Sequence, residues 1–209
     1  MKIMNNQCYA ILPAAGRSRR MGESKLLLPW PTKERPNGRV IDQVLGIWGA
    51  SLVSQVIVVV RQDDQKLADA CAEWPVDIVR PKVDPEDMLD SIRAGVQFLN
   101  QLVHPRSNDI IAICPSDIPT LSSDLINNLC LLCGSSSKIC VPCSENGRGH
   151  PIALPWQLSG KLHDIPVGQG MNALFDLQEF IEYQVTADMI AKDIDTPADY
   201  ITARRMRGY

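Results

Sequence analysis

The chain has 209 residues, of which 21 are basic and 24 acidic, so its formal net charge is −3. This near balance excludes a general electrostatic attraction to nucleic acid, and any anion-binding surface must be local. A hydrophobic fraction of 45% and a charged fraction of 22% are ordinary for a soluble globular protein. We therefore expect a single α/β domain over residues 1–209, built around one substantial core.

In the first half of the chain, continuous apolar runs alternate with segments of helical periodicity. The expected strands are Cys8–Leu12, Gln55–Val60, Val76–Val79 and Asp109–Cys114. The expected helices are Val40–Leu52, Asp64–Glu73, Glu86–Leu102 and Ser122–Cys133. Strands that are apolar throughout are typical of a sheet covered on both faces. The alternation predicts a three-layer α/β/α, Rossmann-like fold with a mostly parallel, mixed sheet.

The second half is less regular. The expected elements there are short strands at Lys138–Val141, Pro151–Leu154 and Glu182–Thr186, a polar turn at Ser144–His150, a short helix at Met171–Leu177 and a final helix at Pro197–Met206. Thr196 suits the N-cap of that last helix, with Pro197 at its first position. Earlier in the chain, prolines and a glycine in Trp30–Arg39 predict an exposed loop.

The N-terminal residues, the lengths of the apolar runs and the cysteine content together indicate the cellular compartment. Met1–Gln7 is short and polar, and no apolar run reaches membrane-spanning length. Seven cysteines, scattered from Cys8 to Cys143, favour a reducing environment over a disulfide framework. We expect a cytoplasmic protein with neither nucleic acid nor membrane as a partner.

The most informative segment is the loop Leu12–Lys25, which follows the first expected strand. Open α/β sheets bind ligands beyond the carboxyl ends of their strands. Small residues at Ala14–Gly16 allow close approach to the backbone, whose N–H groups form an anion-binding concavity. The same loop carries the cations Arg17, Arg19, Arg20 and Lys25. Backbone donors and cations together suit a triphosphate; a solvated basic turn is the simpler alternative.

Spacing excludes two better-known phosphate loops. Position 18 is a serine, so the dinucleotide-binding pattern G-x-G-x-x-G is absent. Gly22 is followed by Glu23 rather than by lysine, so the pattern G-x-x-x-x-G-K-[ST] fails as well.

Two aspartates occupy positions where a sheet could deliver magnesium ligands. Asp117 follows the Asp109–Cys114 strand, and Asp195 precedes the last helix. Mg²⁺ in phosphoryl-type transfer is held by one or two carboxylates together with phosphate oxygens. Each aspartate also has a local interpretation, because Asp117 could cap a turn and Asp195 stands beside the possible capping box of Thr196 and Asp199.

Further polar segments are less specific. Arg148 and His150 could clamp an anionic acceptor, or belong to a tight surface turn. Ser91, like Asp90, could contact a ligand or serve only as a polar residue at a helix start. The pairs Cys130/Cys133 and Cys140/Cys143 are closer together than zinc-ribbon spacing, so we expect buried free cysteines.

The motif Leu12-x-Ala-Ala-Gly-x-Ser-x-Arg-Met-Gly-x-x-Lys25, continued by Leu26–Pro29, resembles the signature of the molybdopterin-type nucleotidyltransferases. Its best match is the molybdenum cofactor cytidylyltransferase branch. Asp117-Ile-Pro119 resembles the family's metal-binding motif, and Ile194-Asp-Thr-Pro197 resembles its C-terminal motif, which supplies a second metal contact. Gly149-His-Pro151 and Met88–Gly95 resemble segments near the second substrate and the base. Together the motifs span nearly the whole chain.

The resemblance implies a fold of the nucleotide-diphospho-sugar transferase type and a magnesium-dependent reaction. CMP is transferred from CTP to a phosphate-bearing acceptor such as molybdopterin, and pyrophosphate is released. The implied catalytic residues are Arg20, Lys25 and Asp117, and the implied metal ligands are Asp117 and Asp195. The implied nucleotide-binding residues are Leu12, Ala14, Ala15, Gly16, Arg17, Ser18, Met21, Gly22 and Ser91. The implied acceptor-binding residues are Arg148, Gly149, His150 and Pro151. A recipient molybdoenzyme, or its chaperone, is the implied protein partner.

Three alternatives stay open. Guanylyl transfer is the nearest rival, although its family members usually carry paired glycines where this chain has Ala14 and Ala15. The opening Pro13–Gly16 also resembles cytidylyltransferases of isoprenoid synthesis. A sensor or carrier that binds nucleotide without catalysis is the alternative of another class. Trp30–Arg39, longer than the matching family turn, and Gly168–Asn172, which lacks a common aspartate, bear on the acceptor.

Overall fold

The computed structural model describes residues 6–17, 24–166 and 168–206. The strands are β1 (Cys8–Pro13), β2 (Gln55–Val59), β3 (Asp77–Val79), β4 (Ile110–Ile113), β5 (Ile139–Ser144), β6 (Gly147–Arg148), β7 (Ile152–Pro155) and β8 (Phe180–Gln184). The α-helices are α1 (Val40–Gly49), α2 (Gln65–Ala72), α3 (Met88–Val103), α4 (Ser123–Ser136), α5 (Leu174–Leu177) and α6 (Pro197–Met206). Short 3₁₀ helices are η1 (Lys25–Leu27), η2 (Trp156–His163), η3 (Met171–Ala173) and η4 (Ala187–Met189). None of the helices in these ranges is long and apolar enough to cross a membrane.

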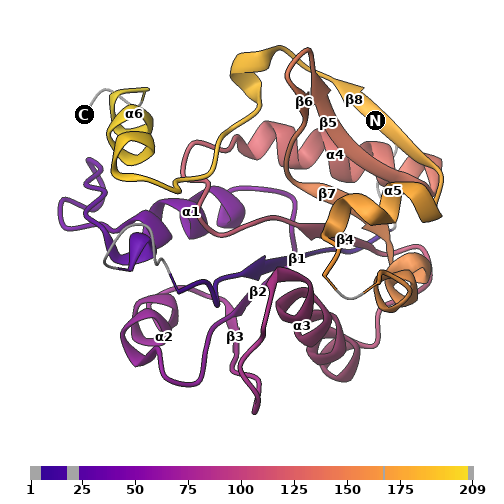
Figure 1. Cartoon of the computed structure of the whole chain (residues 1–209), viewed down its shortest axis with the longest axis horizontal. Helices are drawn as coiled ribbons and strands as arrows, with labels where there is room; N and C mark the ends of the chain where they lie inside the picture. The colour runs from indigo at the N-terminus through magenta and orange to yellow at the C-terminus, as the bar shows by residue number, and fades with distance from the viewer. Residues whose placement is uncertain (1–5, 18–23, 167, 207–209) are drawn as a thin grey trace.

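One mixed sheet organises these elements, in the order β3-β2-β1-β4-β7-β5-β6, with β8 paired to β5 (Figure 1). β3, β2, β1 and β4 run parallel to one another. β7 then runs antiparallel to both β4 and β5, while β8 is parallel to β5. The predicted α/β fold with a mostly parallel, mixed sheet is confirmed.

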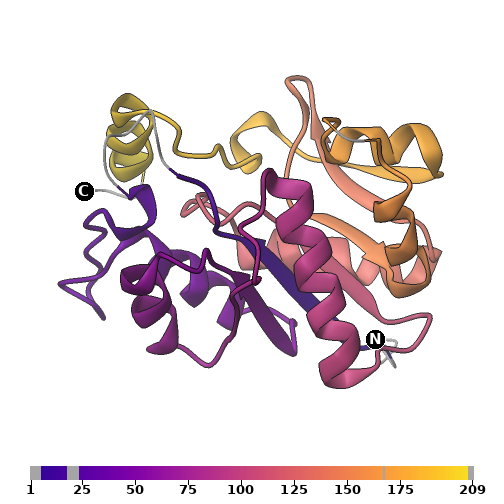
Figure 2. The ribbon, with the colours of Figure 1, turned by 60° about the horizontal axis from the view of Figure 1, so that its bottom comes forward.

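Both faces of the sheet are covered, which explains the continuous apolar strands. In β1, Ala10 and Leu12 face a core formed with α1, α2 and α4. Tyr9 and Ile11 face the opposite core, formed with α3, η2 and α5. Figure 2 shows α3 lying across its face of the sheet. Gly95 permits this close packing, because a Cβ at that position would lie 2.6 Å from Cγ2 of Ile11.

The predicted elements are present with shifts of a few residues at their ends. α3 begins at Met88 because the Asp87 side chain accepts a hydrogen bond from the Asp90 N–H, which makes Asp87 the N-cap. The predicted polar turn is shorter than expected, since β5 continues to Ser144 and β6 pairs back onto it. The expected helix at Met171–Leu177 is divided into η3 and α5. The 3₁₀ helix η2 was not predicted.

The expectation of an exposed loop at Trp30–Arg39 is wrong at its start. Trp30 is only 1% exposed, and its ring meets that of Tyr200 of α6 edge-on at 6.1 Å. The Trp30 N–H donates to Gly38 O, and Pro29 forms an isolated bridge with Arg39. An aromatic side chain between two prolines gave no periodic signal of this burial, because its partner is about 170 residues away on α6.

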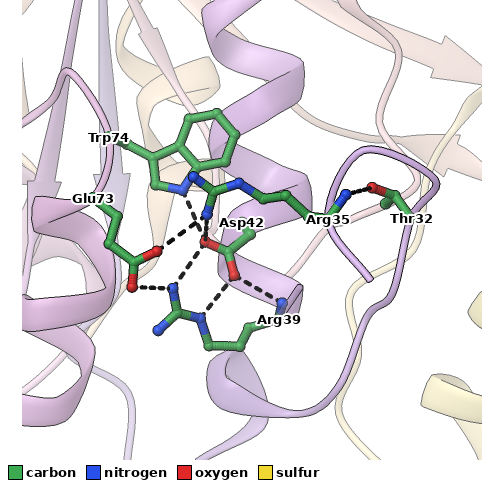
Figure 3. Close-up of polar contacts among 6 residues, drawn as sticks. All are labelled: Thr32, Arg35, Arg39, Asp42, Glu73 and Trp74. Atoms are coloured by element: carbon green, nitrogen blue, oxygen red, sulfur yellow. Dashed lines mark hydrogen bonds and ion pairs between the residues drawn. The ribbon is translucent and has the colours of Figure 1, made fainter. Parts of the chain in front are cut away.

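A buried carboxylate holds the end of this loop against the helices (Figure 3). Asp42, 4% exposed, accepts hydrogen bonds from the Arg39 backbone and guanidinium, from Arg35 and from Trp74 Nε1. Both arginines also pair with Glu73 at the end of α2. Burial alone raises the pKa of Asp42, but the hydrogen bonds from Arg39 and Trp74 outweigh it and hold the pKa below its ordinary value.

We predict that Asp42→Ala lowers the free energy of unfolding by about 3–5 kcal/mol, because two arginines lose a buried partner. Urea denaturation followed by circular dichroism measures the change. Asp164→Ala, which breaks the exposed pair with Lys161, is the matched control and should cost less than about 1 kcal/mol. Equal costs for the two variants would contradict the role given to Asp42.

The depressed pKa also predicts a pH dependence. Stability from Asp42 is present above its unfolded pKa of about 3.9 and is lost as the pH falls through the lower folded value. Asp42→Asn should therefore lose less stability than the wild type between about pH 5 and pH 3. Parallel unfolding curves over that range would refute the linkage.

Candidate active site

The loop after β1 is held in place by the end of β2. The Ala14 N–H donates to Val59 O at 2.8 Å, so this amide is not available to a phosphate. Arg61 donates to the carbonyl oxygens of Ala15 and Gly16 at 3.5 and 3.3 Å. These bonds turn both carbonyls toward Arg61 and fix the start of the loop that was predicted to bind phosphate.

The Asp117 segment is fastened to the same point. The buried Ser116 hydroxyl donates to Pro13 O at 2.7 Å. The Ile194 N–H in turn donates to Asp117 O at 3.0 Å. Two segments that are distant in sequence are thus joined beside the carboxyl end of β1, each by a backbone acceptor.

Three carboxylates meet where these segments join. Oxygens of Asp117, Asp193 and Asp195 lie within 4.8 Å of one another. The Lys25 ammonium pairs with Asp117 and lies 3.1 Å from Asp195 Oδ1. Thr196 and Asp199 make the capping box of α6. The Asp195 side chain is therefore not the cap of this helix.

Burial and the neighbouring opposite charges shift the pKa values of Asp117 and Lys25 in opposite directions. Burial raises the pKa of Asp117 above its ordinary value, Asp193 adds to the rise, and Lys25 opposes it. Burial lowers the pKa of Lys25, but Asp117 and Asp195 outweigh burial, and the net pKa of the ammonium is raised. Lys25 is therefore a cation in the acidic cluster at neutral pH.

A cavity of about 830 Å³ opens over the loop and the cluster. Its lining includes Ala14–Arg17, Lys25, Ser91, Asp117, His150, Asp193 and Asp195. Two lining residues, Arg17 and Asp84, form an ion pair at 3.1 Å. Ser91 is 2% exposed, and its hydroxyl donates to Asp87 O. A volume of this size accommodates a nucleotide-sized ligand.

A second cavity of about 410 Å³ adjoins the first and shares His150 with it. Arg148, Gly149 and Gly168–Asn172 line this smaller cavity. Arg148 lies over the rings of Phe175 and Phe180, at 4.8 and 4.5 Å from their centroids. Its Nε donates to Glu182 at 3.0 Å.

His150 lies at the junction of the two cavities. Its Nδ1 is buried without a hydrogen-bond partner. Burial lowers the pKa of His150 below its ordinary value, and the charge of Asp193 offsets only part of this effect. The imidazole is therefore neutral at pH 7. It does not supply the positive charge that would help His150 to clamp an anionic phosphate, as the sequence suggested.

Most of the predicted site residues that are described lie around these two cavities. Ala14, Ala15, Gly16, Arg17, Lys25, Ser91, Asp117 and Asp195 line the larger one. Leu12 differs, because its fully buried side chain packs in the core and does not line either cavity. Pro151 is buried and lines neither cavity. The predicted residues Ser18, Arg20, Met21 and Gly22 lie outside the described residues.

Sequence reasoning missed three residues of this site. Asp193 had a usable signal, since residues two apart in extended backbone point to the same side, and Asp193 and Asp195 form such a pair. Ser116 stands beside Asp117, but only the fold shows its bond to Pro13. Arg61 gave no signal, because its contact with the loop depends on the pairing of β1 with β2.

The donor set fits a divalent cation. Mg²⁺ and similar ions prefer carboxylate oxygens. Asp117 Oδ1 is buried and has no hydrogen-bond partner in the structure, so the cluster keeps an acceptor that a cation would satisfy. Within the described part of the chain, these three aspartates are the one group of side chains close enough to hold a metal. The seven cysteines are free: six are buried, and Cys143, which we expected to be buried, is half-buried near the end of β5.

Two curated proteins are similar to this chain over most of its length. The chain is 25% identical over 195 residues to the molybdenum cofactor cytidylyltransferase of Escherichia coli (strain K12), covering 93% of this chain and 94% of that protein. It is 24% identical over 198 residues to the "Probable molybdenum cofactor guanylyltransferase" of Mycobacterium avium (strain 104), covering 92% and 93%.

Solved structures give the same fold. Rv0371c from Mycobacterium tuberculosis H37Rv superposes with a TM-score of 0.79 at 24% identity, covering 96% of this chain and 98% of that one. The structure of Rv0371C in complex with manganese superposes with a TM-score of 0.71 at 21% identity, covering 96% and 99%. The family described as "MobA-like NTP transferase domain" matches residues 10–184. The chain belongs to this family of nucleotidyltransferases.

Proposed function

We propose that the protein transfers a nucleotidyl group, preferably CMP from CTP, to the phosphate of a molybdopterin-type acceptor with the aid of Mg²⁺. An oxygen of the acceptor phosphate attacks the α-phosphorus, a new P–O–P bond forms, the bond between the α- and β-phosphates breaks, and pyrophosphate leaves. The observation that carries this proposal is the position of Lys25 and three carboxylates at one end of the larger cavity.

The charged residues suit the two ends of the triphosphate. Asp117 and Asp195, with Asp193 beside them, would hold the metal, which when bound neutralises charge on the phosphates. Lys25 and Arg20 would stabilise negative charge on the departing pyrophosphate. Gly16 and Arg17 line the cavity on the side of the loop and would contact the phosphates or ribose, and Ser91 would lie near the base. Positioning and electrostatics supply the catalysis, and no covalent enzyme intermediate is needed.

The smaller cavity is the proposed acceptor site. Arg148 offers a planar donor fork that suits a phosphate, and two phenylalanine rings hold its guanidinium. Gly149 brings the backbone close to Ile190, because a Cβ there would lie 2.6 Å from Ile190 Cγ2. The neutral imidazole of His150 lies between the two cavities, where it would orient the attacking phosphate rather than neutralise it.

The preference for CTP rests on the resemblance of the Leu12–Lys25 motif, which has Ala14 and Ala15 where guanylyltransferases usually carry paired glycines. The relatives named as a cytidylyltransferase and a guanylyltransferase match at almost the same identity, so GTP is the rival donor. We propose that the product passes to a recipient molybdoenzyme or its chaperone in the cytoplasm.

The metal ligands can be tested by shape-conserving substitutions. We expect Asp117→Asn and Asp195→Asn each to lower pyrophosphate release by at least about 100-fold, because the metal and the phosphates lose a fixed charge. Asp164→Asn, which changes an exposed aspartate paired to Lys161, should release pyrophosphate at the wild-type rate. Near-normal release by a folded Asp117→Asn enzyme would rule out its assigned role.

The donor and the acceptor can be identified together. Pyrophosphate release is measured with each of the four common ribonucleoside triphosphates, with and without molybdopterin. We expect release only with molybdopterin present, and faster with CTP than with GTP. Faster release with GTP would correct the donor, and tight triphosphate binding without any release would favour a sensor.

The acceptor site has its own test. Arg148→Met should raise the KM for the acceptor about tenfold, the loss expected for one charge-assisted hydrogen bond, and leave the KM for the triphosphate unchanged. Lys138→Met, which removes an exposed cation paired to Glu179, is the control. A rise confined to the KM of the triphosphate would assign Arg148 to the donor site instead.

A further inference from the structure

Lys25 lies where a cation is expected, at the acidic cluster of Asp117, Asp193 and Asp195. Its ammonium pairs with Asp117 and lies 3.1 Å from Asp195 Oδ1, and oxygens of the three carboxylates are within 4.8 Å of one another. The side chains of Lys25 and Asp117 are only 15% and 13% exposed. Lys25 therefore pairs with two of the three carboxylates that would ligate a divalent ion.

We infer that Lys25 occupies the metal position of the nucleotide-free protein and leaves it for the phosphates when the nucleotide arrives with its metal. A divalent ion ligated by Asp117 and Asp195 would lie within a few ångströms of an ammonium held by the same two carboxylates. Two cations repel strongly at that separation, particularly where burial limits screening. Lys25 in its present position and the metal are therefore mutually exclusive occupants.

The segment that carries Lys25 and the segment that carries Asp117 are both held in place by the rest of the fold. The movement must therefore be made by the Lys25 side chain. Leu26 and Leu28, next to Lys25, are 5% and 8% exposed and anchor η1 in the core. Tyr200 of α6 donates its hydroxyl to Pro29 O. On the carboxylate side, the Ile194 N–H is bonded to Asp117 O. A change of rotamer at Lys25 is the smallest movement that admits a metal.

The larger cavity offers Lys25 a second anionic partner. Lys25 lines this cavity together with Ala15, Gly16 and Arg17, on the side proposed to receive the triphosphate. A bound triphosphate would replace the carboxylates as the partner of the ammonium, and the metal would replace the ammonium as the partner of the carboxylates. Every charge keeps a counter-charge throughout, which makes the exchange possible in a half-buried site.

This exchange couples the two ligands. Without nucleotide, a metal must displace Lys25 into a position that has no triphosphate to pair with, so metal affinity is low. With nucleotide, the displacement is compensated. By thermodynamic reciprocity, metal raises nucleotide affinity by the same factor. The inference rests on the proposed function for the identity of the site, but concerns binding before any reaction.

The test measures Mn²⁺ binding to the full chain without nucleotide, by electron paramagnetic resonance of the free ion. Lys25→Met keeps the length of the side chain and removes its charge, and we expect it to bind Mn²⁺ about tenfold more tightly than the wild type. Arg17→Met is the matched control, because Arg17 lines the same cavity but pairs with Asp84 and Asp63. It should change Mn²⁺ affinity less than about threefold.

Two results would overturn the inference. One is a Lys25→Met affinity equal to or weaker than that of the wild type. The other is an equal tightening in Arg17→Met, which would indicate the general field of the cavity rather than occupancy of one position. Circular dichroism confirms folding, and Lys25→Gln repeats the test with a polar side chain if Lys25→Met unfolds. Because no turnover is measured, an inactive protein can still give the expected affinities, and an active one can still refute them.

Discussion

The repulsion among the carboxylates of Asp117, Asp193 and Asp195 is the constraint on which the rest of the site depends. Carboxylates this close repel one another unless a cation or a bound proton offsets their charge. Lys25 supplies that cation. It is the first residue of the short 3₁₀ helix η1, whose next residue, Leu26, is buried in the core. The bonds Ser116 to Pro13 and Ile194 to Asp117 hold the acidic segments against β1, so the charges are placed before any ligand binds. A site prepared in this way is suited to a multiply charged anion that brings its own metal.

The two halves of the mixed sheet carry different parts of the site. The parallel strands β1, β2 and β4 deliver the loop and Asp117 to one edge, the usual ligand site of an open α/β sheet. The strands β5–β7, together with the start of α3 and residues 168–172, line the smaller cavity around Arg148, where we place the acceptor. His150 belongs to the lining of both cavities, so the proposed donor and acceptor sites adjoin at this residue.

The sequence predicted the elements that local patterns determine. Continuous apolar runs identified β1, β2 and β4, and Asp117 and Asp195 were expected at one metal before the structure placed their oxygens together. What escaped prediction depends on distant contacts. Trp30 is buried by α6, and Arg61 reaches the loop only because β1 pairs with β2. The antiparallel placement of β7 between β4 and β5 was likewise set by long-range pairing of short strands. Overall identity does not separate the two donors, because the cytidylyltransferase and guanylyltransferase relatives are 25% and 24% identical to this chain.

Crystals grown with Mn²⁺ and a non-hydrolysable triphosphate would test the account most directly, through the anomalous scattering of manganese. The account predicts one strong peak within ligand distance of Asp117 and Asp195, with the Lys25 ammonium withdrawn from both carboxylates and bonded to the phosphates. A peak elsewhere, or Lys25 still paired with Asp117 while the nucleotide is bound, would contradict it.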